Sequence, residues 1–171
     1  MNEKVMEKHD ISVMIPEEDL QKRVCELAEQ ISKDYEGSYV KLICILKGSI
    51  FFTCELAKRI TVPVMLDFMQ VSSYEVKIKK DLDESIEGEN VIIVEDIIDS
   101  GNTLSRLVPM LQARNPKSLK ICTLLSKPDR REVEMDVEYN GFTIPDKFVI
   151  GFGLDFDQRY RNLPYIGVLN L

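Results

Sequence analysis

Apolar residues between positions 17 and 35 recur at the spacing of one face of an α-helix. The residues that share this face are Leu20, Val24, Leu27, Ala28, Ile31 and Tyr35. Pro16 precedes the segment, acidic residues open its first turn, and Gly37 follows its end. The pattern therefore predicts an amphipathic helix over residues 17–35 that packs against a core along one side.

Short, almost uninterrupted apolar runs predict strands at residues 40–46, 64–71, 91–94 and 119–125. The segments between them predict helices at residues 50–60 and 103–113. Runs of this length, rich in β-branched residues, are typical of strands buried on both faces of a parallel sheet. Because strands alternate with helices, the chain is predicted to be an α/β protein whose central parallel sheet is flanked by helices.

The C-terminal third breaks this alternation. Its apolar segments are shorter, near residues 133–139, 148–152 and 165–169, and glycines and prolines separate them. We expect a single domain over residues 1–171, because this length favours one sizeable core. Residues 1–15 and 133–171 are expected to form a small hood over the strand ends, where open α/β sheets bind ligands.

Composition excludes several classes of protein. Hydrophobic residues make up 44% of the chain and charged residues 30%, which is a globular composition. The net charge of −7 argues against broad binding to nucleic acids or anionic membranes. No apolar run approaches the roughly 20 residues that span a bilayer. The first ten residues are charged, and no two of the four cysteines form a CxxC pair, so we expect a cytoplasmic protein with reduced thiols.

The most informative chemistry follows the apolar run at residues 91–94. Two carboxylates, Glu95 and Asp96, come directly after it, and the small polar loop 99–103 then leads into a helix. Amides of such a loop converge on an anion, and the helix N-terminus adds its positive dipole end. The plain alternative is that Ser100 or Thr103 only caps the helix. Neighbouring carboxylates would repel a phosphate unless they bind sugar hydroxyls or metal-bound water.

This stretch resembles the phosphoribosyl pyrophosphate (PRPP) motif of type I phosphoribosyltransferases, and its surroundings resemble the bacterial hypoxanthine-guanine members. Further segments in family order are 46–49, 71–74, 126–128, 145–151, 154–155 and 160–161. Together they span nearly the whole chain. The resemblance implies the type I phosphoribosyltransferase fold, with the hood described above.

The resemblance assigns the 5′-phosphate of PRPP to the loop residues Asp99, Ser100, Gly101, Asn102 and Thr103. It places Glu95 and Asp96 at the ribose hydroxyls and, together with Asp155, near Mg²⁺. By the same resemblance Asp99 is the catalytic base that takes a proton from the purine ring. The residues alone do not separate Asp99 from Asp96 in this role.

The remaining site residues also come from the resemblance. Lys47 and Gly48 form a pyrophosphate loop with a cis peptide before Lys47, and Arg161 is a second pyrophosphate contact. Lys127 donates to the 6-oxo group of the base. The residues expected around the rest of the base are Phe148, whose ring stacks on it, Val149, whose backbone meets its edge, and Asp155.

Two further pairs complete the set. Ser73 and Tyr74 open the family's flexible lid over PRPP, but here charged residues follow at once where the family has a longer loop rich in Gly, Ser and Thr. The departure indicates a shortened lid or residues missing from the sequence. Arg130 is expected to be a surface residue, whereas Arg131 is a candidate to reach pyrophosphate.

The resemblance implies a Mg²⁺-dependent enzyme of purine salvage. It would transfer the phosphoribosyl group of PRPP to hypoxanthine or guanine, as a homodimer or homotetramer without a nucleic-acid or membrane partner. Two alternatives stay open. The base could be xanthine or a pyrimidine, or the chain could be a nucleotide-sensing regulator of the same fold.

Overall fold

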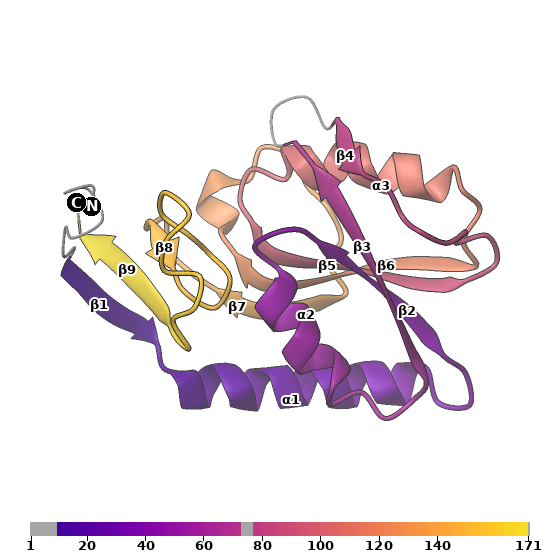
Figure 1. Cartoon of the computed structure of the whole chain (residues 1–171), viewed down its shortest axis with the longest axis horizontal. Coiled ribbons are helices and arrows are strands. Elements are labelled where there is room, and N and C mark those ends of the chain that lie inside the picture. Colours follow the sequence, from indigo (N-terminus) through magenta and orange to yellow (C-terminus); the bar gives the residue numbers. More distant parts are fainter. Residues whose placement is uncertain (1–9, 73–76, 171) are drawn as a thin grey trace, which may run out of the picture.

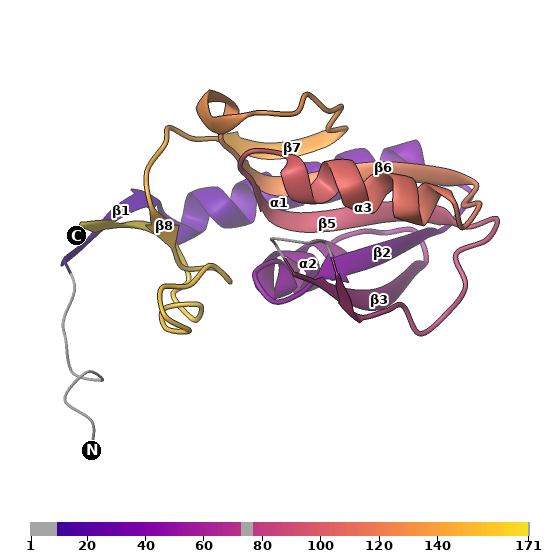
Figure 2. The same ribbon diagram turned by 90° about the horizontal axis from the view of Figure 1, so that it is seen from above.

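The computed structural model describes residues 10–72 and 77–170, which form a large sheet, a small sheet and flanking helices (Figures 1 and 2). The large sheet has the order β4-β3-β2-β5-β6-β7. Its strands are β2 (Val40–Ile45), β3 (Val64–Val71), β4 (Ile78–Lys80), β5 (Asn90–Ile98), β6 (Ser118–Ser126) and β7 (Tyr139–Thr143). Only β4 runs antiparallel to its neighbour. The predicted α/β fold with a central, mostly parallel sheet is confirmed.

Helices cover both faces of this sheet. Successive strand residues point to opposite faces, so Ile92 and Val94 pack on one side with α1 (Glu17–Asp34) and α2 (Ile50–Ala57). Val91 and Ile93 pack on the other side with α3 (Asn102–Gln112). Two apolar faces explain why the strands read as continuous apolar runs rather than alternating ones.

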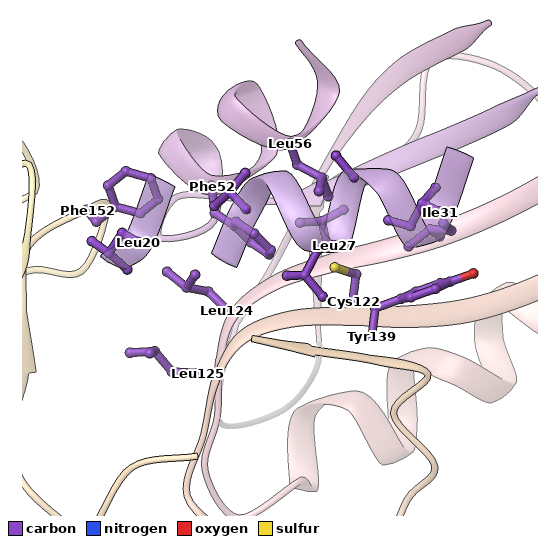
Figure 3. Packing of buried hydrophobic residues seen from close by; sticks show 14 of the residues in the cluster. Leu20, Leu27, Ile31, Phe52, Leu56, Cys122, Leu124, Leu125, Tyr139 and Phe152 are labelled. Atoms are coloured by element: carbon purple, nitrogen blue, oxygen red, sulfur yellow. The ribbon is translucent and has the colours of Figure 1, made fainter. Parts of the chain in front are cut away.

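The larger core lies between α1, α2 and the sheet (Figure 3). Leu20 and Leu27 of α1, Phe52 of α2 and Leu124 of β6 are fully buried there. Phe152, from the segment after β8 (Val149–Ile150), packs into the same cluster. This contact attaches the C-terminal region to the main body beside the carboxyl ends of the parallel strands.

The small sheet is the hood. It has the order β1-β9-β8 and is antiparallel, with β1 (Asp10–Ile15) and β9 (Ile166–Asn170) bringing the two ends of the described chain together (Figure 1). The expected hood range 133–171 begins too early, because β7 pairs parallel to β6 at the edge of the large sheet. No helix among residues 10–72 and 77–170 is long and apolar enough to cross a membrane.

Two element boundaries also differ from the sequence predictions. Strand β5 continues past Val94 to Ile98, so Glu95 and Asp96 lie within the strand rather than after it. The reason is pairing with β6, which supports β5 as far as Ile98. Helix α2 ends at Ala57 instead of residue 60, and of the apolar segment near residues 133–139 only Tyr139 belongs to a strand, β7.

Candidate functional site

A cavity of about 640 Å³ opens at the carboxyl ends of the parallel strands. It lies where β2, β3 and β5 finish, and the segment that follows β8 covers it from the hood side. Of the residues predicted for the site, those that line it are Lys47, Gly48, Glu95, Asp96, Asp99, Ser100, Gly101, Thr103, Asp155 and Arg161. Three separate stretches of sequence therefore meet around one space.

The loop after β5 is shaped to bind an anion. Gly101 is the N-cap of α3 with φ +84°, and it has no side chain that could cap the helix. The Ser100 side-chain oxygen accepts the backbone N–H of Asn102 at 3.3 Å, so part of the helix-cap alternative for Ser100 holds. Ser100 also accepts backbone hydrogen bonds from Glu132 and Val133 through its carbonyl oxygen, at 2.9 and 3.1 Å. These bonds hold the loop from behind, so its inner side and the helix N-terminus face the cavity.

Asn102 departs from its predicted place. Its side-chain amide donates to Glu132 at 2.6 Å, and the residue does not line the cavity. The reason is its position as the first residue of α3, directed toward the 3₁₀ turn (Pro128–Arg130) and the segment behind it. Its side chain therefore stabilises the loop 99–103, called the phosphate loop below, through the contact with Glu132.

The two carboxylates of β5 lie in unequal environments. Glu95 is buried, and burial together with the charge of Asp96 raises its pKa well above the usual range. Burial also raises the pKa of Asp96 to about 6, with a further rise from Asp155 and an opposing effect of Arg161. Two acids held this way are poised to meet cations or hydroxyl donors in the cavity.

The turn after β2 approaches Asp96 closely. The Leu46–Lys47 peptide is cis, as the resemblance implied, and Lys47 is exposed at the cavity rim. A β-carbon at Gly48 would overlap the carboxylate of Asp96. Only glycine therefore fits between β2 and β5 at this point.

The segment after β8 carries the opposite wall. Arg161 contacts Asp155 at 2.7 Å (Nη2–Oδ1) and donates to the carbonyl of Gly153 at 2.7 Å. A β-carbon at Gly153 would in turn overlap the carbonyl oxygen of Gly48. The segment after β8 and the turn after β2 are thus in contact through Gly153 and Gly48.

Gln158 is a cavity residue that the sequence analysis missed. Its side-chain oxygen accepts hydrogen bonds from Lys47 at 3.2 Å and from Arg161 at 3.4 Å. Its backbone N–H donates to Asp155 at 2.8 Å. No local pattern marks this glutamine, because its partner Lys47 is 111 residues away in the chain. The glutamine oxygen brings two cations together at one point.

Of the residues predicted to contact the base, Asp155 lines the cavity, whereas Lys127, Phe148 and Val149 do not. Lys127 is buried at the end of β6, and its ammonium lies 3.7 Å from Asp146. Phe148 is 47% exposed and stacks edge-to-face on Phe156, with ring centroids 5.8 Å apart. Val149 is buried at the start of β8. The exposed aromatic ring of Phe148 offers a surface on which a flat heterocycle can stack.

The two arginines that follow Lys127 fit their predictions to different degrees. Arg130 is exposed, as expected of a surface residue, and it forms an ion pair with Asp99 at 3.2 Å (Nε–Oδ1). Arg131 packs behind the phosphate loop near Gly101 and donates to Ser126 at 2.8 Å, away from the lining of the cavity. Ser73 and Tyr74 lie outside the described residues.

An amide loop, paired acids and two cations around one cavity define an α/β protein that binds a phosphorylated sugar. Comparison with known families gives the same class: the model of the phosphoribosyl transferase domain matches residues 16–157. The chain belongs to the phosphoribosyltransferase family, as its motifs predicted.

The similar proteins narrow the class further. The hypoxanthine phosphoribosyltransferase of Salmonella typhimurium is 53% identical over 170 residues, covering 94% of this chain and 96% of the relative. The hypoxanthine-guanine phosphoribosyltransferase of Bacillus subtilis is 50% identical over 173 residues, covering 96% of each. A hypoxanthine-guanine phosphoribosyltransferase structure from Bacillus anthracis superposes with a TM-score of 0.92 at 46% identity, covering 95% of this chain and 100% of that one.

Proposed function

We propose that this chain transfers the 5-phosphoribosyl group of PRPP to hypoxanthine, and to guanine, in purine salvage. The products are the nucleoside 5′-monophosphate and pyrophosphate. The observation that carries the proposal is the single cavity that joins the amide loop 99–103, the acids of β5 and the turn at Lys47. Identity near 50% over almost the full length to hypoxanthine phosphoribosyltransferases supports the choice of base.

The reaction exchanges one bond at the anomeric carbon. The bond to pyrophosphate oxygen breaks, a bond to a purine nitrogen forms, and the purine loses a ring proton. The loop 99–103 holds the 5′-phosphate, and Lys47 and Arg161 meet the departing pyrophosphate. Asp99, in the same loop, accepts the proton. The contribution of the protein is therefore positioning and charge stabilisation, with no covalent intermediate on the chain.

Mg²⁺ is the metal we propose for this site. No group of three or more metal-binding side chains occurs within the described residues, which suits an ion that keeps water and substrate oxygens as most of its ligands. Asp155 and Asp96 line the cavity and are the carboxylates that would hold it, with Glu95 beside them. The bound ion would neutralise charge on pyrophosphate.

The test is product formation from labelled hypoxanthine with PRPP and Mg²⁺, run in parallel with guanine, xanthine and uracil. We expect turnover of hypoxanthine or guanine that a chelator abolishes. Turnover of uracil alone would overturn the purine assignment. Tight RNA binding in a gel shift, without product from any base, would instead support the regulator, which the net charge of −7 disfavours.

Lys127 is proposed to select 6-oxo bases. Replacing it with alanine removes a buried charged donor, and such a bond contributes roughly 1.5–3 kcal/mol. We therefore expect the KM for hypoxanthine to rise by roughly 10- to 100-fold, while the KM for PRPP stays nearly unchanged. Steady-state kinetics in both substrates measures this, and equal losses for the two substrates would contradict the role.

A homodimer or homotetramer is proposed for the assembled protein. Four large apolar side chains are exposed on α2 and the adjoining β3, namely Ile50, Phe51, Met65 and Leu66. Exposed apolar side chains such as Leu66, at 46% the most exposed of the four, are candidates for burial in a subunit interface. We expect Leu66→Asp to reduce the mass in sedimentation from a multiple of 19.7 kDa toward a single chain. Val13→Asp, at an exposed apolar position in the hood, is the matched control and should leave the mass unchanged.

The cytoplasm is the compartment we propose. The described cysteines, Cys25, Cys44, Cys54 and Cys122, are all free, and Cys44 and Cys122 are buried in the core. Unpaired thiols of this kind suit a reducing compartment.

A further inference from the structure

A chain of charges links two residues at opposite ends of the proposed base site. Asp99 lies 3.2 Å from Arg130, Arg130 lies 3.5 Å from Asp146, and Asp146 lies 3.7 Å from Lys127. These residues come from the loop after β5, the end of β6 with its 3₁₀ turn, and the segment between β7 and β8. Arg130 is the member that joins the proton acceptor to the lysine side.

The contact with Arg130 orients the carboxylate of Asp99 but makes no hydrogen bond to its Oδ1 atom. The Oδ1 atom of Asp99 is shielded from solvent and accepts no hydrogen bond from any described residue, although Nε of Arg130 is 3.2 Å away. A forked arginine pair would engage both carboxylate oxygens and compete with an incoming proton. Arg130 instead attracts the carboxylate of Asp99 without a hydrogen bond to Oδ1, so the lone pairs of this oxygen stay available for a proton.

The guanidinium of Arg130 also weakens the ion pair between Lys127 and Asp146. Nη1 of Arg130 donates to Oδ1 of Asp146, and the same oxygen is the nearest acidic partner of Lys127. Asp146 is about half exposed, whereas the side chain of Lys127 is 7% exposed. Because Arg130 shares the charge of Asp146, the aspartate holds Lys127 less tightly, and the ammonium remains free to donate elsewhere.

We propose that Arg130 is a positioning residue of the base site. It holds Asp99 in place as proton acceptor and shares Asp146 with Lys127, so that the two groups that meet the purine keep a fixed separation. This proposal rests on the proposed function. It adds a residue that acts through Asp99 and Lys127 rather than on the substrate itself.

The test compares Arg130→Met, which keeps the length of the side chain without its charge, with Arg130→Lys. A misplaced reacting group costs up to about 100-fold, so we expect Arg130→Met to lower kcat roughly 10- to 100-fold with the KM for PRPP unchanged. Arg130→Lys should recover part of this loss. An unchanged kcat, an equal loss in the KM for PRPP, or no recovery by lysine would overturn the proposal.

Asp146→Asn distinguishes the effect of Arg130 on Asp99 from its effect on Lys127. It removes the shared acid while leaving the contact between Arg130 and Asp99, so we expect a changed KM for hypoxanthine with kcat nearly retained. A fall in kcat as large as that of Arg130→Met would show that Asp99 is not held separately, against the proposal. Arg130 and Asp146 are both about half exposed, so melting temperatures should match the wild type. Wild-type protein that turns over no base would refute the proposed function itself, before any variant is compared.

Discussion

Replacing Asp99 with asparagine is expected to lower kcat by about 10²- to 10⁴-fold, the range that a positioned general base contributes. The amide has the shape of the carboxylate but cannot accept the ring proton of the purine. The proposed contacts of the loop with the 5′-phosphate would come from backbone amides, and the bonds from residues 132 and 133 to the Ser100 carbonyl keep the loop in place. The KM for PRPP should therefore change by no more than a few-fold.

Steady-state kinetics at saturating PRPP measures the loss, and equilibrium binding of PRPP measures what is retained. Asp129→Asn, at an exposed carboxylate two residues after Lys127, is the matched control and should keep wild-type kcat. If Asp99→Asn turned over at the wild-type rate, Asp99 would not be the base, and Asp96 would become the candidate. A parallel collapse of PRPP binding would instead assign Asp99 to ligand binding.

The fold could be predicted because its signals are local. Strands such as β2 and β6, buried on both faces, leave continuous apolar runs, and α1 shows one apolar face after Pro16. The position of the loop 99–103 between a strand and a helix was also predictable from its small residues, while its binding of phosphate stays a prediction. The cis peptide before Lys47 followed from the family resemblance and from no property of the residues themselves.

What escaped prediction depends on contacts between distant segments. The extension of β5 through Asp96 is stabilised by β6, and β7 joins the large sheet because β6 offers it a free edge. Gln158 and Arg130 carry no distinguishing pattern, and their roles arise only where loops from different parts of the chain meet. Burial of a glutamate like Glu95 is likewise invisible until its neighbours are placed.

Gly48, in the turn after β2, lies against both β5 and the segment after β8 in the wall of the cavity. On one side its missing side chain makes room for the carboxylate of Asp96, whose Oδ1 is fixed by the backbone N–H of Ile97 at 2.8 Å. On the other side its carbonyl oxygen lies against Gly153, which itself has φ +106° and no room for a β-carbon. The turn after β2 therefore cannot move toward the hood to relieve a clash with Asp96.

Gly48→Ala is accordingly expected to displace either Asp96 or Lys47, and a shift of about 1 Å at a substrate-positioning group can cost about 100-fold in kcat/KM. Kinetics with varied PRPP should show a loss of this order, together with weaker pyrophosphate inhibition. Gly88→Ala is the control: at φ +71° with nothing near its added carbon, it should cost about 1–2 kcal/mol of stability and no activity, since it precedes β5 at the opposite end of the sheet. Wild-type kinetics in Gly48→Ala would mean that the turn and Asp96 do not act on PRPP together, and the assignment of this cavity wall to pyrophosphate would be wrong.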